Sequence, residues 1–133
     1  MRAAFGRPDL FVSANSHSGA LMHGGRDGPR PDGPLSPQEF RRIFGDRPAG
    51  TDHDLVALAR RAKQSGVPLP RLLLDCGTED FLIEDNRSFH RELERLGVAH
   101  DYGEFPGAHT WDYWDDHVRD AIAFHLQTLT LHD

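Results

Sequence analysis

Residues 71–76 read Arg-Leu-Leu-Leu-Asp-Cys, an apolar run between Pro70 and the loop Gly77-Thr78-Glu79-Asp80. A short run of this kind between chain breakers is typical of a strand that is covered on both faces, as in a parallel sheet. Shorter apolar segments predict two more strands, over Leu10–Ser16 and Val98–Phe105. The run at 71–76 therefore predicts the central part of an α/β sheet.

Helical segments alternate with these strands. The expected helices are a tail over Arg2–Gly6, one from the cap Ser36 to Gly45, one from the cap Thr51 to Gly66, one over Leu82–Leu96 and one from Trp111 to Leu129. Strands that alternate with helices indicate βαβ crossovers, and hence a mostly parallel sheet with helices on both faces. We expect residues 1–133 to form a single partial α/β domain, because three strands are few for such a sheet.

Composition narrows the function classes. The chain of 133 residues has 15 Lys and Arg against 21 Asp and Glu, a formal net charge of −6, which disfavours nucleic acid and anionic membranes as partners. The lone Cys76 cannot form an intrachain disulfide, and no stretch approaches the roughly 20 apolar residues of a membrane span. We therefore expect a cytoplasmic protein that binds neither nucleic acid nor a membrane.

Two loops at strand ends carry the candidate chemistry. In parallel sheets, ligands gather beyond the carboxyl ends of the strands. The loop after residues 71–76 holds Glu79 and Asp80, and the loop after 98–105 holds His109. A carboxylate that accepts the proton of one imidazole nitrogen leaves the other nitrogen free to act as a base. Spacing alone does not choose between Glu79 and Asp80, and either could instead cap the following helix.

The two loops also carry a family resemblance. The run Leu74-Asp75-Cys76-Gly77-Thr78-Glu79-Asp80-Phe81-Leu82-Ile83-Glu84-Asp85-Asn86, followed by Phe105-Pro106-Gly107-Ala108-His109-Thr110-Trp111-Asp112-Tyr113-Trp114, resembles the C-terminal part of an esterase group of α/β-hydrolases. That group contains tributyrin esterases and S-formylglutathione hydrolase. The stretches Phe5–Phe11 and Ser16–Ala20 resemble the part that follows the nucleophile elbow, so the resemblance covers nearly the whole chain.

The resemblance implies a serine carboxylic-ester or thioester hydrolase without cofactor or metal. In it Asp80 is the acid and His109 the general base of a catalytic triad, and the substrates are small esters or thioesters. The family serine lies in a G-x-S-x-G elbow, which these 133 residues lack, so we expect the nucleophile upstream of Met1. The alternative is a non-catalytic fragment or pseudoenzyme that acts as a binding or assembly module, and a homo-oligomer is possible through its sheet edge.

Other side chains have competing interpretations. Ser18 lacks the flanking glycines of an elbow, and Cys76 is expected to be a buried, inert thiol. The last helix is expected to have one apolar face, formed by Trp111, Trp114, Val118, Ile122, Leu126 and Leu129. Trp111 and Trp114 are therefore expected to pack in the core rather than line an acyl pocket. A metal site from His17, His23 and Asp27, or from His117 and His125, is disfavoured by spacing. The Gly/Pro-rich segment 22–37 is predicted to be a surface loop, with a substrate lid as the alternative.

Overall fold

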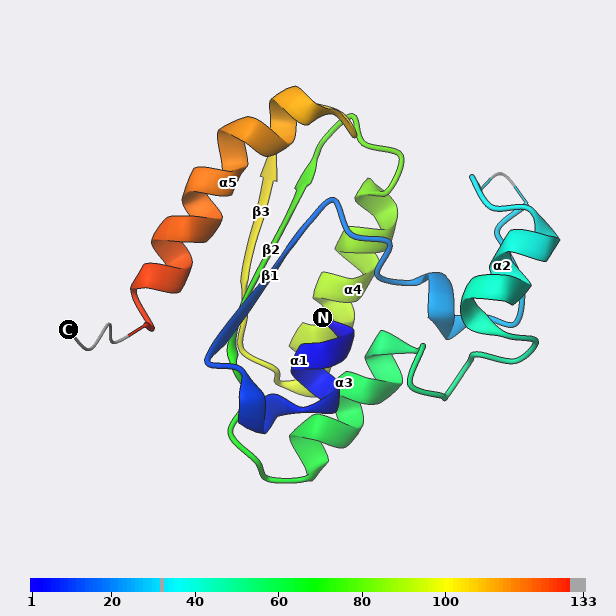
Figure 1. Ribbon diagram of the computed structural model, residues 1–133, viewed down its shortest axis with the longest axis horizontal. Coiled ribbons are helices and arrows are strands. Elements are labelled where there is room, and N and C mark those ends of the chain that lie inside the picture. The colour runs from blue at the N-terminus through cyan, green and yellow to red at the C-terminus, as the bar shows by residue number, and fades with distance from the viewer. Residues whose placement is uncertain (32, 130–133) are drawn as a thin grey trace.

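The computed structural model describes residues 1–31 and 33–129. Its helices and strands form three layers, a sheet with helices on each face (Figure 1). The sheet contains β1 (Ser13–His17), β2 (Arg71–Gly77) and β3 (Asp101–Phe105) in that spatial order, and both pairs are parallel. One face of the sheet is covered by α1 (Arg2–Gly6), α3 (Leu55–Gln64) and α4 (Ile83–Leu96), and the other by α5 (Trp111–Leu126). The predicted α/β fold with helices on both faces is confirmed.

Strand β2 is the centre of the sheet. Its Leu74 lies opposite Ser16 of β1 and Tyr102 of β3. Leu72, Leu74 and Cys76 are buried, as the apolar run at 71–76 predicted. The main core lies between the sheet and α1, α3 and α4, and it consists of Phe5, Leu21, Leu58, Ala59, Ala62, Leu72, Leu74, Phe89, Leu93 and Val98.

Two predicted strands begin later than expected. Leu10 belongs to a 3₁₀ turn, η1 (Pro8–Leu10), and Leu10, Phe11 and Val12 are exposed rather than buried, so β1 starts only at Ser13. The chain after α4 is held differently. Gly97 adopts the left-handed conformation and the Val98 N–H donates to the carbonyl of Leu93, a helix-ending motif that draws Val98 into the core and delays β3 to Asp101.

Two helices, α2 (Pro37–Phe44) and α3, lie between β1 and β2 in the chain, and local sequence predicted the N-cap of the first but not of the second. The capping box at Ser36 and Glu39 opens α2, which ends before Gly45 as predicted. The expected cap Thr51 is wrong, because Asp54 caps α3 by accepting from the N–H groups of Val56 and Ala57. The Thr51 hydroxyl instead donates to the carbonyl of Pro48 within the preceding turn.

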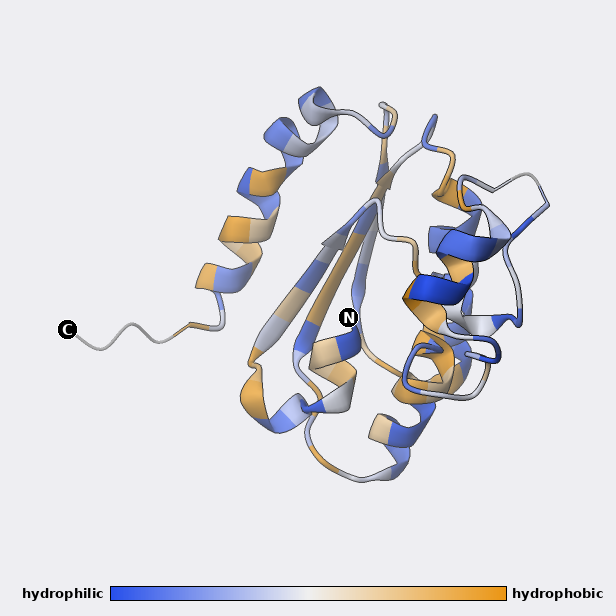
Figure 2. Ribbon diagram, turned by 45° about the vertical axis from the view of Figure 1, so that its right-hand side comes forward, coloured by the Kyte–Doolittle hydropathy of each residue, from blue (hydrophilic) through white to orange (hydrophobic). Residues whose placement is uncertain are grey.

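Helix α5 meets the sheet through a polar seam. Ser13 and Asn15 of β1 both bond to His125, at 2.7 Å to Nδ1 and 3.0 Å to Nε2. The predicted core face of α5 is therefore wrong, since Trp111 is 82% exposed and Trp114 is only partly buried. Figure 2 shows that the apolar residues of α5 lie mostly in its C-terminal half. The exposed stripe of this helix contains Val118, Ile122 and Leu126, whereas Tyr113, Ala121 and Phe124 are buried.

The segment 22–37, of which residue 32 lies outside the described residues, contacts α4 through two of its side chains. It contains a 3₁₀ turn, η2 (His23–Gly25), where His23 and Gly24 are buried, so the surface-loop prediction fails at that point. His23 and Arg30 both approach the buried carboxylate of Asp85 on α4, at 3.0 and 2.7 Å. Within residues 1–31 and 33–129, no helix is long and apolar enough to cross a membrane.

Candidate active site

Two loops meet at the carboxyl ends of β2 and β3. We call residues 77–80 the acid loop and residues 106–110 the histidine loop. The Thr78 N–H donates to the carbonyl of Phe105 at 2.8 Å, which continues the strand pairing into the loops. A Cβ at Gly77 would lie 2.1 Å from the carbonyl oxygen of Gly107, so only glycine allows this approach. The loops are therefore in backbone contact.

Asp80 and His109 face each other across this contact. His109 Nδ1 lies 3.0 Å from Asp80 Oδ2, and the side chain of Asp80 is completely buried. Because a carboxylate oxygen can only accept, the proton of this bond is on Nδ1 and Nε2 is left as the basic nitrogen. The other oxygen, Oδ1, accepts the N–H of Leu82 at 2.8 Å, at the N-cap of α4. Asp80 therefore holds the turn that leads into α4 and contacts the imidazole at the same time.

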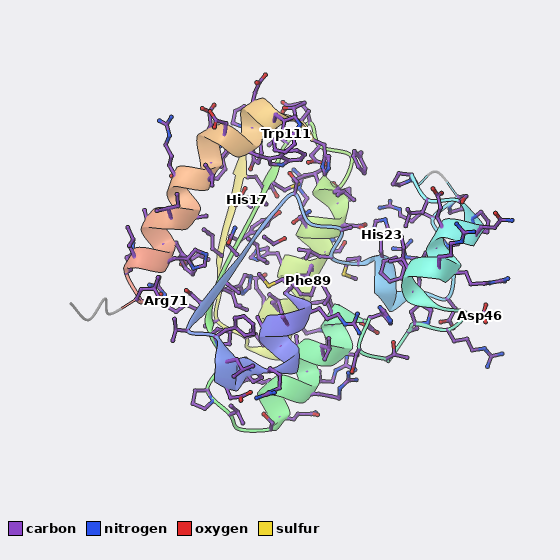
Figure 3. The ribbon with its side chains drawn as sticks, viewed as in Figure 1. His17, His23, Asp46, Arg71, Phe89 and Trp111 are labelled. Atoms are coloured by element: carbon purple, nitrogen blue, oxygen red, sulfur yellow. The ribbon has the colours of Figure 1, made fainter. Side chains whose placement is uncertain are left out.

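The imidazole of His109 is partly open to solvent. Its side chain is 34% exposed, and two aromatic rings flank it, Phe81 at 4.8 Å and Trp114 at 4.9 Å between ring centroids. Among the described residues, no hydrogen bond reaches its Nε2. Trp111 extends the aromatic cluster from Trp114 and is visible at the start of α5 in Figure 3. The imidazole therefore lies beside exposed aromatic surface, since Phe81 and Trp111 are both exposed.

Glu79 contacts the backbone of the histidine loop and not the imidazole. Its N–H donates to the carbonyl of Gly107 at 3.0 Å, and its carboxylate accepts the Gly107 N–H at 2.5 Å. That second bond is the main reason why the pKa of Glu79 lies below its usual value. Of the two neighbouring carboxylates, the structure brings Asp80 to His109 and Glu79 to Gly107.

A second histidine–carboxylate pair lies at the same end of the sheet, and sequence reasoning missed it. Asp75 is 3% exposed and accepts from His17 Nδ1 at 2.5 Å and from the Tyr113 hydroxyl at 2.9 Å. Burial and the bond to Asp75 raise the pKa of Tyr113 far above its usual value. The available signal was Asp75 itself, a charged residue in an otherwise apolar strand. Figure 3 shows His17 near the end of β1.

The alternative nucleophiles are poorly placed for attack. Ser18 is 4% exposed, has a positive φ of 48°, and its N–H donates to the carbonyl of Asp75. Cys76 is buried as expected, and this burial raises the pKa of its thiol to about 12. A thiol with that pKa is protonated and unreactive near neutral pH.

The histidines that were considered as metal ligands contact different partners. His17 contacts Asp75, His23 contacts Asp85, His117 contacts Asp120, and His125 bonds to Ser13 and Asn15. Across residues 1–31 and 33–129, no three His, Cys, Asp or Glu side chains form a cluster that could hold a metal ion.

Comparison with known proteins places this geometry in context. Residues 1–125 match the family described as "Putative esterase". An acetyl esterase of Caldicellulosiruptor saccharolyticus is 36% identical over 85 residues, which is 62% of this chain and 32% of that protein. Two solved structures from Staphylococcus aureus are 29% identical, and each match covers 92% of this chain and 48% of the other. They are a substrate-bound fluorophosphonate-binding serine hydrolase (TM-score 0.79) and an S-formylglutathione hydrolase (TM-score 0.77). The chain thus spans about a third to a half of these relatives.

Proposed function

The chain belongs to the esterase family that matches it over residues 1–125, and from this premise we propose that it supplies the acid and the general base of a serine carboxylic-ester hydrolase. The observation that carries the proposal is the 3.0 Å contact between His109 Nδ1 and the buried carboxylate of Asp80. Asp80 holds the imidazole in the tautomer with a basic Nε2, and it stabilises the imidazolium when that nitrogen takes up a proton.

The nucleophile is a serine hydroxyl from outside these 133 residues, because the sequence contains no G-x-S-x-G elbow. As the serine Oγ bonds to the carbonyl carbon, its proton passes to His109 Nε2. The same proton then protonates the departing alkoxide or thiolate as the ester or thioester bond breaks. Water hydrolyses the acyl-serine, with Nε2 again as the base, and the serine hydroxyl is restored.

The proposed substrates are esters or thioesters with a small acyl group. The aromatic rings of Phe81 and Trp114 beside the imidazole offer an apolar surface, which suits an apolar acyl group. The names of the relatives, an acetyl esterase and an S-formylglutathione hydrolase, agree with one- and two-carbon acyl groups. No cofactor takes part in this chemistry.

The test uses the protein that also carries the serine-bearing segment, with p-nitrophenyl acetate as substrate. Asp80→Asn should lower kcat by up to about ten-thousand-fold while the fold remains, because an amide favours the wrong imidazole tautomer. Asp112→Asn, a change to an acidic residue in the first turn of α5, is the matched control and should leave kcat within about twofold. Equal activity of Asp80→Asn and the unmodified protein would contradict the proposal.

A second experiment uses the 133-residue chain alone. Without nucleophile and oxyanion hole, its rate should stay near that of imidazole at equal concentration. A rate thousands of times higher that a fluorophosphonate abolishes would mean that a serine of this chain attacks, and Ser18→Ala would then identify or exclude Ser18.

The alternative function, a non-catalytic assembly module, is favoured by one observation. The stripe of Val118, Ile122 and Leu126 on α5 is exposed, although such side chains are usually covered in a helix of this length. A module of that kind would keep its association when Asp80 and His109 are both replaced, and the protein with the serine-bearing segment would show no esterase activity.

A further inference from the structure

The histidine loop has few internal constraints. Strand β3 ends at Phe105, so the ladder offers no strand partner to Gly107, which has a φ of +137°. His109 is two residues further on and only partly buried, and Phe81, one of the rings that flank it, is itself exposed. Burial alone therefore does not explain how the imidazole stays opposite Asp80.

Two residues, Tyr113 and Glu79, hold Gly107. The Tyr113 ring packs against its α-carbon so closely that a Cβ at Gly107 would lie 2.8 Å from the ring, and the Tyr113 hydroxyl is tied to Asp75. From the acid loop, Glu79 binds both backbone groups of Gly107, its N–H to the carbonyl oxygen and its carboxylate to the N–H. A reciprocal pair of this kind fixes orientation as well as distance.

From this geometry we propose that Glu79 is a positioning residue, which holds the histidine loop at the backbone of Gly107 and so keeps His109 opposite Asp80. The inference rests on the proposed function, because it assigns Glu79 a role in that same site. Glu79 makes no contact with the imidazole in the structure, and it acts only through the loop.

The carboxylates of Asp80 and Glu79 have different contacts, and we therefore assign them different roles. Asp80 accepts from the Leu82 N–H and from His109, whereas the Gly107 N–H donates to Glu79. If the Glu79 carboxylate is removed, the Gly107 N–H loses its partner and bonds to water, while the bond from the Glu79 N–H to the Gly107 carbonyl remains. The histidine loop is then held less tightly and can shift relative to Asp80. A displacement of about 1 Å at a catalytic group can lower the rate by about a hundredfold.

The test follows two local signals by NMR in the 133-residue chain. These are the hydrogen exchange of the Gly107 amide and the proton on His109 Nδ1, which the bond to Asp80 protects from solvent. Glu79→Ala should speed the Gly107 exchange by at least about tenfold and broaden the Nδ1 proton signal. Glu79→Gln should restore both signals, because its amide oxygen still accepts the Gly107 N–H. Glu94→Ala, a change on the exposed side of α4, is the control and should leave both signals unchanged.

The possible results distinguish a positioning role of Glu79 from a general effect on stability, and from a failure of the proposed function. Unchanged Gly107 exchange and an unchanged Nδ1 proton in Glu79→Ala would overturn the role of Glu79, as would a Glu79→Gln variant that behaves like Glu79→Ala. If Glu79→Ala does not fold, Glu79→Asp, which is one methylene too short to reach Gly107, must show the faster exchange, and retained protection overturns the role. Loss of the Nδ1 signal in Asp80→Asn is expected throughout. A signal that survives Asp80→Asn counts against the proposed function instead.

A kinetic readout completes the test in the protein with the serine-bearing segment. Glu79→Ala should lower kcat by about 10- to 100-fold with KM within about twofold, and Glu79→Gln should recover most of the loss. A purely structural role would lower the melting temperature without this separation of kcat from KM, and that result would overturn the proposal.

Discussion

The close approach of the two loops makes Gly77→Ala a sharp perturbation. The added Cβ would lie 2.1 Å from the carbonyl oxygen and 2.7 Å from the carbonyl carbon of Gly107. Ordinary contact begins at 3.4 Å, so the histidine loop has to retreat by about 1.3 Å, the difference between 3.4 and 2.1. The neighbour is backbone rather than a flexible side-chain end, so the loop must move as a unit.

The size of the effect follows from that displacement. Overpacking of this kind costs about 1–3 kcal/mol of the free energy of unfolding, which for a domain of this size lowers the melting temperature by roughly 3–15 °C. The distance from His109 Nδ1 to Asp80, now 3.0 Å, would increase to roughly 4 Å, beyond hydrogen-bond range. Gly77→Ala should therefore destabilise the fold and separate the acid from the base.

The assay combines calorimetry with the NMR signal of the His109 Nδ1 proton. Gly28→Ala is the matched control, because a Cβ there meets nothing within 4 Å and its melting temperature should change by less than about 2 °C. A Gly77→Ala protein with the melting temperature and Nδ1 signal of the unmodified chain would show that the two loops are not in backbone contact, contrary to this prediction.

Three further predictions concern the core, the thiol and the surface. Phe89→Ala should lower the free energy of unfolding by about 3–5 kcal/mol, because Phe89 is fully buried against Phe5. Phe81 is exposed, so Phe81→Ala should lower it far less, and denaturant melts of the two variants make the comparison. The raised pKa of Cys76, about 12, keeps the folded thiol protonated, so it should react slowly with a disulfide reagent at pH 8, and rapid labelling of the folded chain would contradict this. The free energy of unfolding should also fall as pH rises above the usual thiol pKa near 9, because there the thiol ionises only in the unfolded chain. The chain should self-associate through the exposed α5 stripe and the β1 edge, which has no strand partner among the described residues, and Ile122→Glu with Leu126→Lys should shift light scattering toward monomer; an unmodified chain that is already monomeric would count against it.

Local patterns in the sequence were enough for much of the architecture. The apolar run at 71–76 marked the buried central strand, and the box at Ser36 and Glu39 marked the start of α2, because both depend on neighbouring residues only. Some boundaries were wrong. Val98 was expected in a strand, but its N–H bonds to the carbonyl of Leu93 and its side chain lies in the core, so it belongs to the turn that ends α4.

Local sequence was enough to predict the order of strands and helices and the two loops in which a carboxylate and an imidazole could meet. Spacing did not choose between Glu79 and Asp80, although the family resemblance implied Asp80. The contacts of Asp80 with His109 and of Glu79 with Gly107 join residues 29 and 28 apart, so they depend on the folded chain. The same holds for α5, whose periodicity identified an apolar stripe but not the surface that it would meet. Ser13 and Asn15 of β1 bond to His125 on the inner side of that helix, and the stripe remains exposed. Periodicity shows which side chains share one apolar face of a helix. Whether that face is buried depends on the shape and polarity of the surface opposite it, which is present only in the folded chain.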